Sequence, residues 1–154
     1  MKETIDSRLA ELGIVLPAAA APAANYLPWQ RTGNLLFTAG QLPVLDGKLQ
    51  WAGLAGREID TDTGRQAARL CAVNVLAQAK AALGDLERVR RVVKITVFVA
   101  SAPDFVEQHL IANGASDLFV AVLGDRGKHA RSAVGMASLP LNAAVEVEAV
   151  FEVE

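Results

Sequence analysis

The chain has 154 residues, enough for one domain with its own core; 52% are hydrophobic and only 21% are charged, which excludes a disordered chain. A formal net charge of −2 excludes the strongly basic surface typical of nucleic-acid-binding proteins. The only cysteine is Cys71, which excludes an internal disulfide and indicates a reducing compartment.

A short helix is predicted first, because residues 4–12 carry apolar side chains at helical spacing and Gly13 is a suitable stop. The apolar run 14–24 is rich in alanine and interrupted by two prolines, which indicates an extended arm rather than a signal peptide or a membrane span. We therefore expect a cytoplasmic protein with a single domain over 1–154 and an N-terminal helical extension at about 1–20.

Two hairpins are predicted next. Residues 29–34 flank the first hairpin, with Thr-Gly-Asn as its turn, and 35–39 form a short apolar strand. The Asp-Gly pair within 45–48 predicts the second turn.

Residues 62–83 form the clearest helix, with caps at 60–62 and Gly84. Cys71 lies in this alanine-rich pattern, so we interpret it as a buried thiol rather than a nucleophile. The apolar face comprises Ala72, Val75, Leu76, Ala79 and Leu83.

A β-branched strand is predicted over 92–100, and a second helix from about Asp104 to Gly124, opened by Pro103. Asn113-Gly114 is a weak point in this helix, and indicates either a break or a close approach by another element. In the strand one face is predicted to carry Val93, Ile95, Val97 and Val99, and the other Lys94, Thr96 and Phe98.

Two closing strands are predicted over 130–136 and 144–153, which completes an α+β fold with two helices on one face of a mixed sheet. Arg131 heads the first strand and Glu146 lies in the second. A guanidinium fork matches a carboxylate, and a partly buried glutamate can move a proton. We expect the intervening turn to bring Glu146 near the strand of Arg131.

The other charged clusters predict no site. Basic residues within 87–91, with Lys94 beyond, are interpreted as a solvated edge. His109 and His129 have no ligand spacing with cysteines or carboxylates, so no metal site is expected.

The chain resembles the RidA/YjgF family, the reactive-intermediate deaminases that were formerly labelled endoribonuclease L-PSP. The resemblance covers roughly 21–152. Its most specific part is Ala-Arg-Ser at 130–132, Leu-Pro at 139–140 and Val-Glu-Val-Glu-Ala at 145–149, supported by Gly33-Asn34, 37–43 and 93–99. The N-terminal helix and the loop 124–128 look like those of the family's longer, outlying members.

This resemblance implies a chorismate-mutase-like fold and a homotrimer whose sheets form a central barrel, with sites in the clefts between subunits. RidA-like members hydrolyse 2-imino or enamino acids to 2-oxo acids and ammonia without a cofactor. It also implies that Arg131 grips the substrate carboxylate and that Glu146 positions or activates water. The remaining pocket positions are Tyr26, Gly40, Gln41, Asn113 (with one residue more than usual between it and Arg131) and Ala133, where many members have cysteine.

Three functions are compatible with the sequence. The first is imine or enamine deamination of small carboxylates. The second is non-catalytic binding of a small metabolite in the same intersubunit cleft. The third is ribonuclease activity, which follows only from the older family label and which the charge balance disfavours. For Arg131 a purely structural ion pair, with Glu148 or an acidic neighbour in the trimer, is the alternative to substrate binding.

Overall fold

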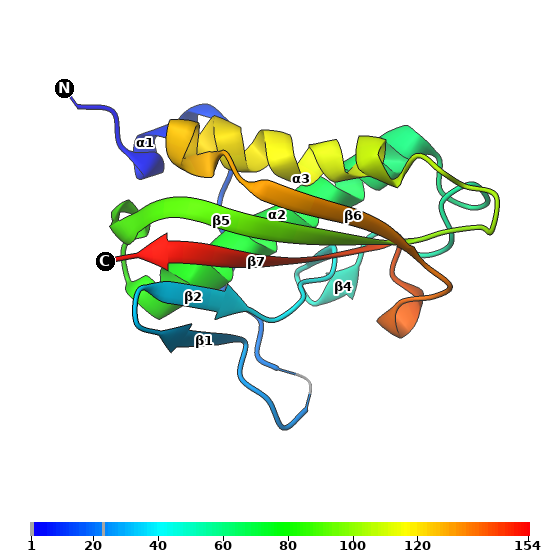
Figure 1. Ribbon diagram of the computed structural model, residues 1–154, viewed down its shortest axis with the longest axis horizontal. Coiled ribbons are helices and arrows are strands. Elements are labelled where there is room, and N and C mark those ends of the chain that lie inside the picture. Colours follow the sequence, from blue (N-terminus) through cyan, green and yellow to red (C-terminus); the bar gives the residue numbers. More distant parts are fainter. Residues whose placement is uncertain (1, 23) are drawn as a thin grey trace.

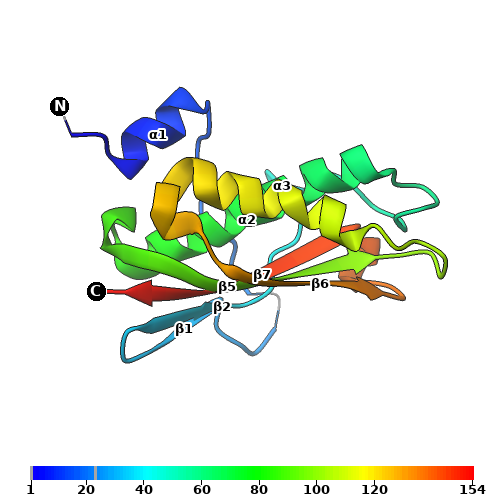
Figure 2. The ribbon, with the colours of Figure 1, turned by 45° about the horizontal axis from the view of Figure 1, so that its top comes forward.

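The computed structural model describes residues 2–22 and 24–154. Two long helices, α2 and α3, lie on one face of a five-stranded sheet (Figure 1), which confirms the predicted α+β class. The short helix α1 packs beside α3, farther from the sheet (Figure 2). The helices are α1 (Ile5–Glu11), α2 (Thr61–Leu83) and α3 (Gln108–Leu123), and the strands are β1 (Trp29–Thr32), β2 (Leu35–Thr38), β3 (Val44–Leu45), β4 (Lys48–Leu49), β5 (Val89–Ala100), β6 (Ala130–Met136) and β7 (Val145–Val153).

The strand order in the main sheet is β1-β2-β7-β5-β6, and among the described strands of this sheet only the β5–β6 pair is parallel. The helix α3 is a crossover that returns the chain as a strand parallel to β5. The turn after β6 then carries the chain across β5, so that β7 pairs with β5 on its other side. The strands of Arg131 and Glu146 are therefore not neighbours, and the expectation that they adjoin is wrong.

The long helix α2 follows the predicted pattern closely. The Asp60 carboxylate accepts a hydrogen bond of 2.7 Å from the backbone N–H of Thr63 at the start of the helix. Gly84, with a φ of 79°, ends it in a conformation that favours glycine. The predicted apolar face is buried against the sheet: Ala72, Val75, Leu76, Ala79 and Leu83.

The strand β5 departs from simple alternation. Its pairing with β7 shifts register between Val89 and Arg91 and again between Val92 and Lys94. Val92 is consequently buried, while Val93, predicted to share the face of Ile95, is 38% exposed. A bulge inserts an extra residue and reverses the side-chain alternation beyond it.

The helix α3 begins at Gln108, four residues later than predicted. The residues before it form a turn in which the backbone N–H of Phe105 donates to the Ala102 carbonyl at 3.0 Å. Phe105 packs against the core, which holds this segment outside the helix. Gly114 lies inside a continuous helix, where a side chain would meet the backbone of Arg65, so the weak point marks close packing of α3 on α2.

The strand β7 alternates as predicted between buried apolar residues on the helix-covered face and Glu146, Glu148, Val150 and Glu152 on the other. No helix among the described residues covers that second face, which we call the open face (Figure 2). It carries exposed apolar side chains from three positions, Leu35, Phe37 and Val134.

Candidate active site

Arg131 points toward α3 from the edge strand β6. Its Nη1 donates to the Asn113 amide oxygen at 2.9 Å and to Ser116 Oγ at 3.1 Å, and its Nη2 donates to the His109 carbonyl at 3.1 Å. Asn113 and Ser116 lie one turn apart on the same helix face. The predicted proximity of Asn113 to Arg131 is therefore present in the structure.

These partners leave the positive charge of Arg131 uncompensated. Within residues 2–22 and 24–154, no carboxylate lies within ion-pair distance of the guanidinium, so the suggested ion pair with Glu148 is absent in the protomer. A guanidinium has five N–H donors, and three hydrogen bonds to side chains and backbone occupy three of them. The two remaining N–H donors match the two hydrogen bonds that a carboxylate accepts when it binds in a bidentate way.

Besides the His109 carbonyl, two side chains near this arginine were not predicted from the sequence: Ser116, which contacts Arg131 directly, and His129, which contacts it through Ser116. Ser116 Oγ lies 2.8 Å from His129 Nε2, and His129 Nδ1 lies 2.6 Å from the Gly127 carbonyl oxygen. The sequence held a signal, since Ser116 follows Asn113 by three residues and His129 precedes Arg131 by two. Neither spacing resembles a metal site, so the sequence alone gives no reason to group these residues.

Glu146 lies on the open face, away from Arg131. A Cβ on Gly40 would overlap the Glu146 carboxyl group and lie 2.9 Å from its Cγ, so the backbone of Gly40 lies directly against this side chain. Burial, and secondarily the negative charge of Glu148, raise the pKa of Glu146. A carboxylate with a raised pKa is a stronger base than an ordinary one, which suits it to accepting a proton from water.

Tyr26, Gly40 and Gln41 line a pocket of about 480 Å³ beside the end of β2. The backbone of Gln41 pairs with Val147 of β7, which places this pocket next to the strand of Glu146. Tyr26 is half exposed at 51%. The predicted pocket residues therefore fall into two groups within one protomer.

We call these groups the arginine half-site (Arg131, Asn113 and Ala133) and the glutamate half-site (Glu146, Gly40, Gln41 and Tyr26). Ala133 faces the same side of β6 as Arg131, opposite Val97. The two half-sites are separated because β5 lies between β7, which carries Glu146, and β6, which carries Arg131. The structure thus brings the residues of each half-site together but does not join the halves.

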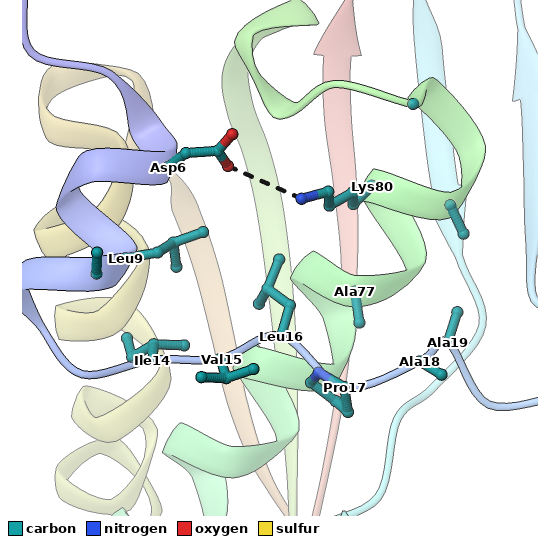
Figure 3. Close-up of a pocket in the computed structure, with 13 residues that line it drawn as sticks. Asp6, Leu9, Ile14, Val15, Leu16, Pro17, Ala18, Ala19, Ala77 and Lys80 are labelled. Atoms are coloured by element: carbon teal, nitrogen blue, oxygen red, sulfur yellow. Dashed lines mark ion pairs between the residues drawn. The ribbon is translucent and has the colours of Figure 1, made fainter.

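A second hollow lies between α1, the segment after it and α2 (Figure 3). Its lining is mainly apolar, and Lys80 Nζ and Asp6 Oδ1 form an ion pair of 3.8 Å at its rim. It contains none of the predicted site residues.

Cys71 is fully buried, and burial raises the pKa of its thiol well above the ordinary value. Its Sγ donates weakly to the Val145 carbonyl at 3.5 Å, and its burial confirms the prediction of a buried thiol. The described part of the chain has no group of three His, Cys, Asp or Glu side chains suited to a metal. It also has no helix long and apolar enough to cross a bilayer.

Comparison with known proteins places this architecture in a family. The family model described as YjgF/chorismate-mutase-like, putative endoribonuclease, matches residues 6–153. Protein TCP17 of Trypanosoma cruzi is 52% identical over 96% of this chain and 93% of its own length. A crystal structure of a protein of unknown function from Agrobacterium tumefaciens is 57% identical, with a TM-score of 0.92, over 97% of this chain and 92% of the other.

Other solved structures show how far the similarity in shape extends. A putative endoribonuclease from Shewanella oneidensis is 34% identical, with a TM-score of 0.96, over 98% of this chain and all of the other. A RidA from the Antarctic bacterium Psychrobacter is 28% identical, with a TM-score of 0.60, over 88% of this chain and 94% of the other. The matched model, covering both half-sites, and these relatives show that the chain belongs to the RidA/YjgF family with a chorismate-mutase-like fold.

Proposed function

We propose that this protein hydrolyses reactive 2-imino and enamino acids to 2-oxo acids and ammonia, in a cleft between the subunits of a homotrimer. The proposal rests on the surroundings of Arg131. Its hydrogen-bond partners are neutral, no carboxylate among the described residues pairs with it, and two of its N–H donors are left for a ligand. Such a group is suited to binding the carboxylate of a small acid.

The chemistry requires a held substrate and a delivered water, without a covalent nucleophile. Water adds to the carbon of the protonated C=N bond and loses one proton, and the resulting carbinolamine expels ammonia as its hydroxyl becomes the oxo group. Arg131 holds the carboxylate next to the reacting carbon. Glu146, with its raised pKa, accepts the proton of the attacking water.

The separation of the half-sites supports a site shared between subunits. One protomer keeps Arg131 and Glu146 on different faces of the sheet, so a single chain does not surround a small substrate with both. The exposed apolar residues of the open face, such as Phe37 and Val134, are the kind of surface that another subunit covers. A trimer would place the arginine half-site of one subunit against the glutamate half-site of the next.

The test measures ammonia and 2-oxo acid released from 2-imino acids that an amino-acid oxidase generates in situ. We expect acceleration by the wild type, a loss of about 10-fold to 100-fold in kcat/KM for Arg131→Ala from lost charged hydrogen bonds, and a lower kcat for Glu146→Gln. Arg57→Ala removes an exposed arginine outside both half-sites and serves as the matched control.

The competing function, non-catalytic binding of a small carboxylate, gives a different result in the same experiment. Thermal stabilisation of the wild type by a 2-oxo acid, lost in Arg131→Ala and accompanied by no ammonia release from several imino acids, would replace the enzyme by a binding protein.

A further inference from the structure

We propose that Ser116 and His129 are positioning residues for Arg131: they hold its guanidinium in the orientation that leaves two N–H donors for a substrate carboxylate. The identity of that ligand rests on the proposed function, but the orientation of Arg131 is a property of the protein alone.

The directions of the hydrogen bonds follow from the groups involved. The Gly127 carbonyl oxygen, 2.6 Å from His129 Nδ1, can only accept, so Nδ1 carries a hydrogen. Arg131 Nη1, 3.1 Å from Ser116 Oγ, can only donate. The single hydrogen of the Ser116 hydroxyl is therefore available for His129 Nε2 at 2.8 Å. With a neutral imidazole every donor in this chain of contacts meets an acceptor.

The far end of this chain of contacts is part of the backbone. Gly127 lies so close to α3 that a side chain on it would meet the Phe119 carbonyl and lie 2.9 Å from the Val120 Cα. The rings of Phe119 and His129 pack edge to face with centroids 6.1 Å apart. His129 is thus fixed by a carbonyl and by an aromatic ring, and it fixes the direction of the Ser116 hydroxyl in turn.

This arrangement matters because Arg131 lies on an edge strand and has a long, flexible side chain. Binding a carboxylate with a mobile guanidinium costs rotamer entropy that an oriented one has already lost. Ser116 Oγ and the Asn113 amide oxygen occupy the two hydrogens of Nη1. Losing the oriented hydroxyl would free one of them and let the guanidinium rotate away from the direction that suits a bidentate partner.

The first arm of the test uses no ligand. The ¹⁵Nε–H signal of Arg131, assigned by its absence in Arg131→Lys, is followed by relaxation measurements in the full-length protein. His129→Gln keeps an acceptor near the Nε2 position, whereas His129→Asn keeps a donor near Nδ1 and loses that acceptor. We expect Arg131 to stay ordered in His129→Gln and Ser116→Thr, and to become mobile in His129→Asn and Ser116→Ala. Ser138→Ala, an exposed serine away from Arg131, is the control.

The second arm measures steady-state deamination by the same variants. We expect KM to rise about 5-fold to 30-fold in His129→Asn and Ser116→Ala, which corresponds to a loss of about 1–2 kcal/mol in binding free energy, with little change in kcat. His129→Gln and Ser116→Thr should recover most of the wild-type KM.

The outcomes separate this inference from the proposed function. If Arg131 is equally ordered in all variants, the positioning role is overturned, whether or not the wild type releases ammonia. If both His129 variants lose kcat while Arg131 stays ordered, His129 acts as a base and the positioning role is again overturned. A wild type without deaminase activity removes the proposed function, and the relaxation measurements still decide the inference. His129→Asn and Ser116→Ala each test the positioning role independently. If one variant fails to fold, the other still decides whether Arg131 depends on this chain of contacts.

Discussion

Arg131 and Glu146 leave the same sheet on opposite faces, with β5 between their strands. Arg131 is opposite Ile95 of β5, a buried residue on the helix-covered face, whereas Glu146 is opposite Phe98, on the open face. Two strand spacings, about 10 Å, separate them across the sheet, and the offset from Ile95 to Phe98 adds about 10 Å along it. A site that uses both residues therefore needs a second subunit.

Mixed trimers should recover activity from two variants that are each impaired. The Arg131→Ala and Glu146→Gln subunits are unfolded together and refolded. A site is intact when a Glu146→Gln subunit supplies its arginine and an Arg131→Ala subunit supplies its glutamate. Random assembly with cyclic symmetry leaves about a quarter of the sites intact, and we expect about that share of the wild-type rate. Deamination is measured against each variant refolded alone, and no recovery in mixed trimers would place both residues in one subunit's site.

The pH dependence of turnover should respond to Glu148. Its negative charge contributes to the raised pKa of Glu146, after burial. A general base must be deprotonated, so kcat/KM rises with pH through that pKa. Glu148→Gln removes the repulsion and lowers the pKa of Glu146, and the rising limb should move to lower pH. Glu107→Gln, an exposed carboxylate outside both half-sites, is expected to leave the profile in place, and an unmoved limb in Glu148→Gln would contradict the assignment.

The same shift predicts a change in stability. Because the folded state raises the pKa of Glu146, it binds this proton more tightly than the unfolded state does. The charged carboxylate therefore destabilises the fold above the folded-state pKa, and this penalty disappears as pH falls below the unfolded value. Glu146→Gln should raise Tm at neutral pH and lose that advantage in acid. Thermal unfolding from pH 7 to pH 3 would check this, and a Tm difference independent of pH would refute it.

Gly40→Ala should damage the site while sparing the fold. A Cβ at Gly40 would overlap the Glu146 carboxyl group and lie 2.9 Å from its Cγ, and this flexible side chain can change rotamer at little cost in folding free energy. We expect Tm to change by a few degrees at most and kcat to fall toward the value for Glu146→Gln. Gly33→Ala is the comparison: its φ of 55° makes alanine strained, but nothing lies within 4 Å of the new Cβ. The Tm of Gly33→Ala should fall, whereas its kcat should stay at the wild-type value.

Gly114→Ala should be destabilising although it lies in a helix. Alanine in place of glycine in an exposed helix would add about 1 kcal/mol of stability. Here the new Cβ would lie 2.8 Å from the carbonyl carbon of Arg65 in the backbone of α2, and forcing the helices apart typically costs about 1–3 kcal/mol. We expect a net loss in the free energy of urea unfolding. Asp117→Ala, at an exposed position of the same helix, should change it little, and a more stable Gly114→Ala would show that α3 can shift freely.

Local spacing accounts for what could be predicted from the sequence alone. The caps and apolar face of α2, the turns at Gly33 and Gly47, and the alternation in β7 depend on residues a few positions apart. The motifs around Arg131 and Glu146 were sufficient to indicate the family, which the comparisons show. These features follow from the periods of helix and strand and from turn chemistry, which neighbouring residues determine.

The way in which these elements meet depends on contacts between distant parts of the chain. The insertion of β5 between β6 and β7 separated Arg131 from Glu146, although the chain joins their strands by one turn. The bulge at Val92 reversed a face that alternation had assigned to Val93. The contacts among Ser116, His129 and Arg131 bring together the helix α3, the segment between α3 and β6, and the edge strand β6. Strand order, bulges and side-chain networks depend on pairings between distant segments, which the local pattern of a single chain does not encode.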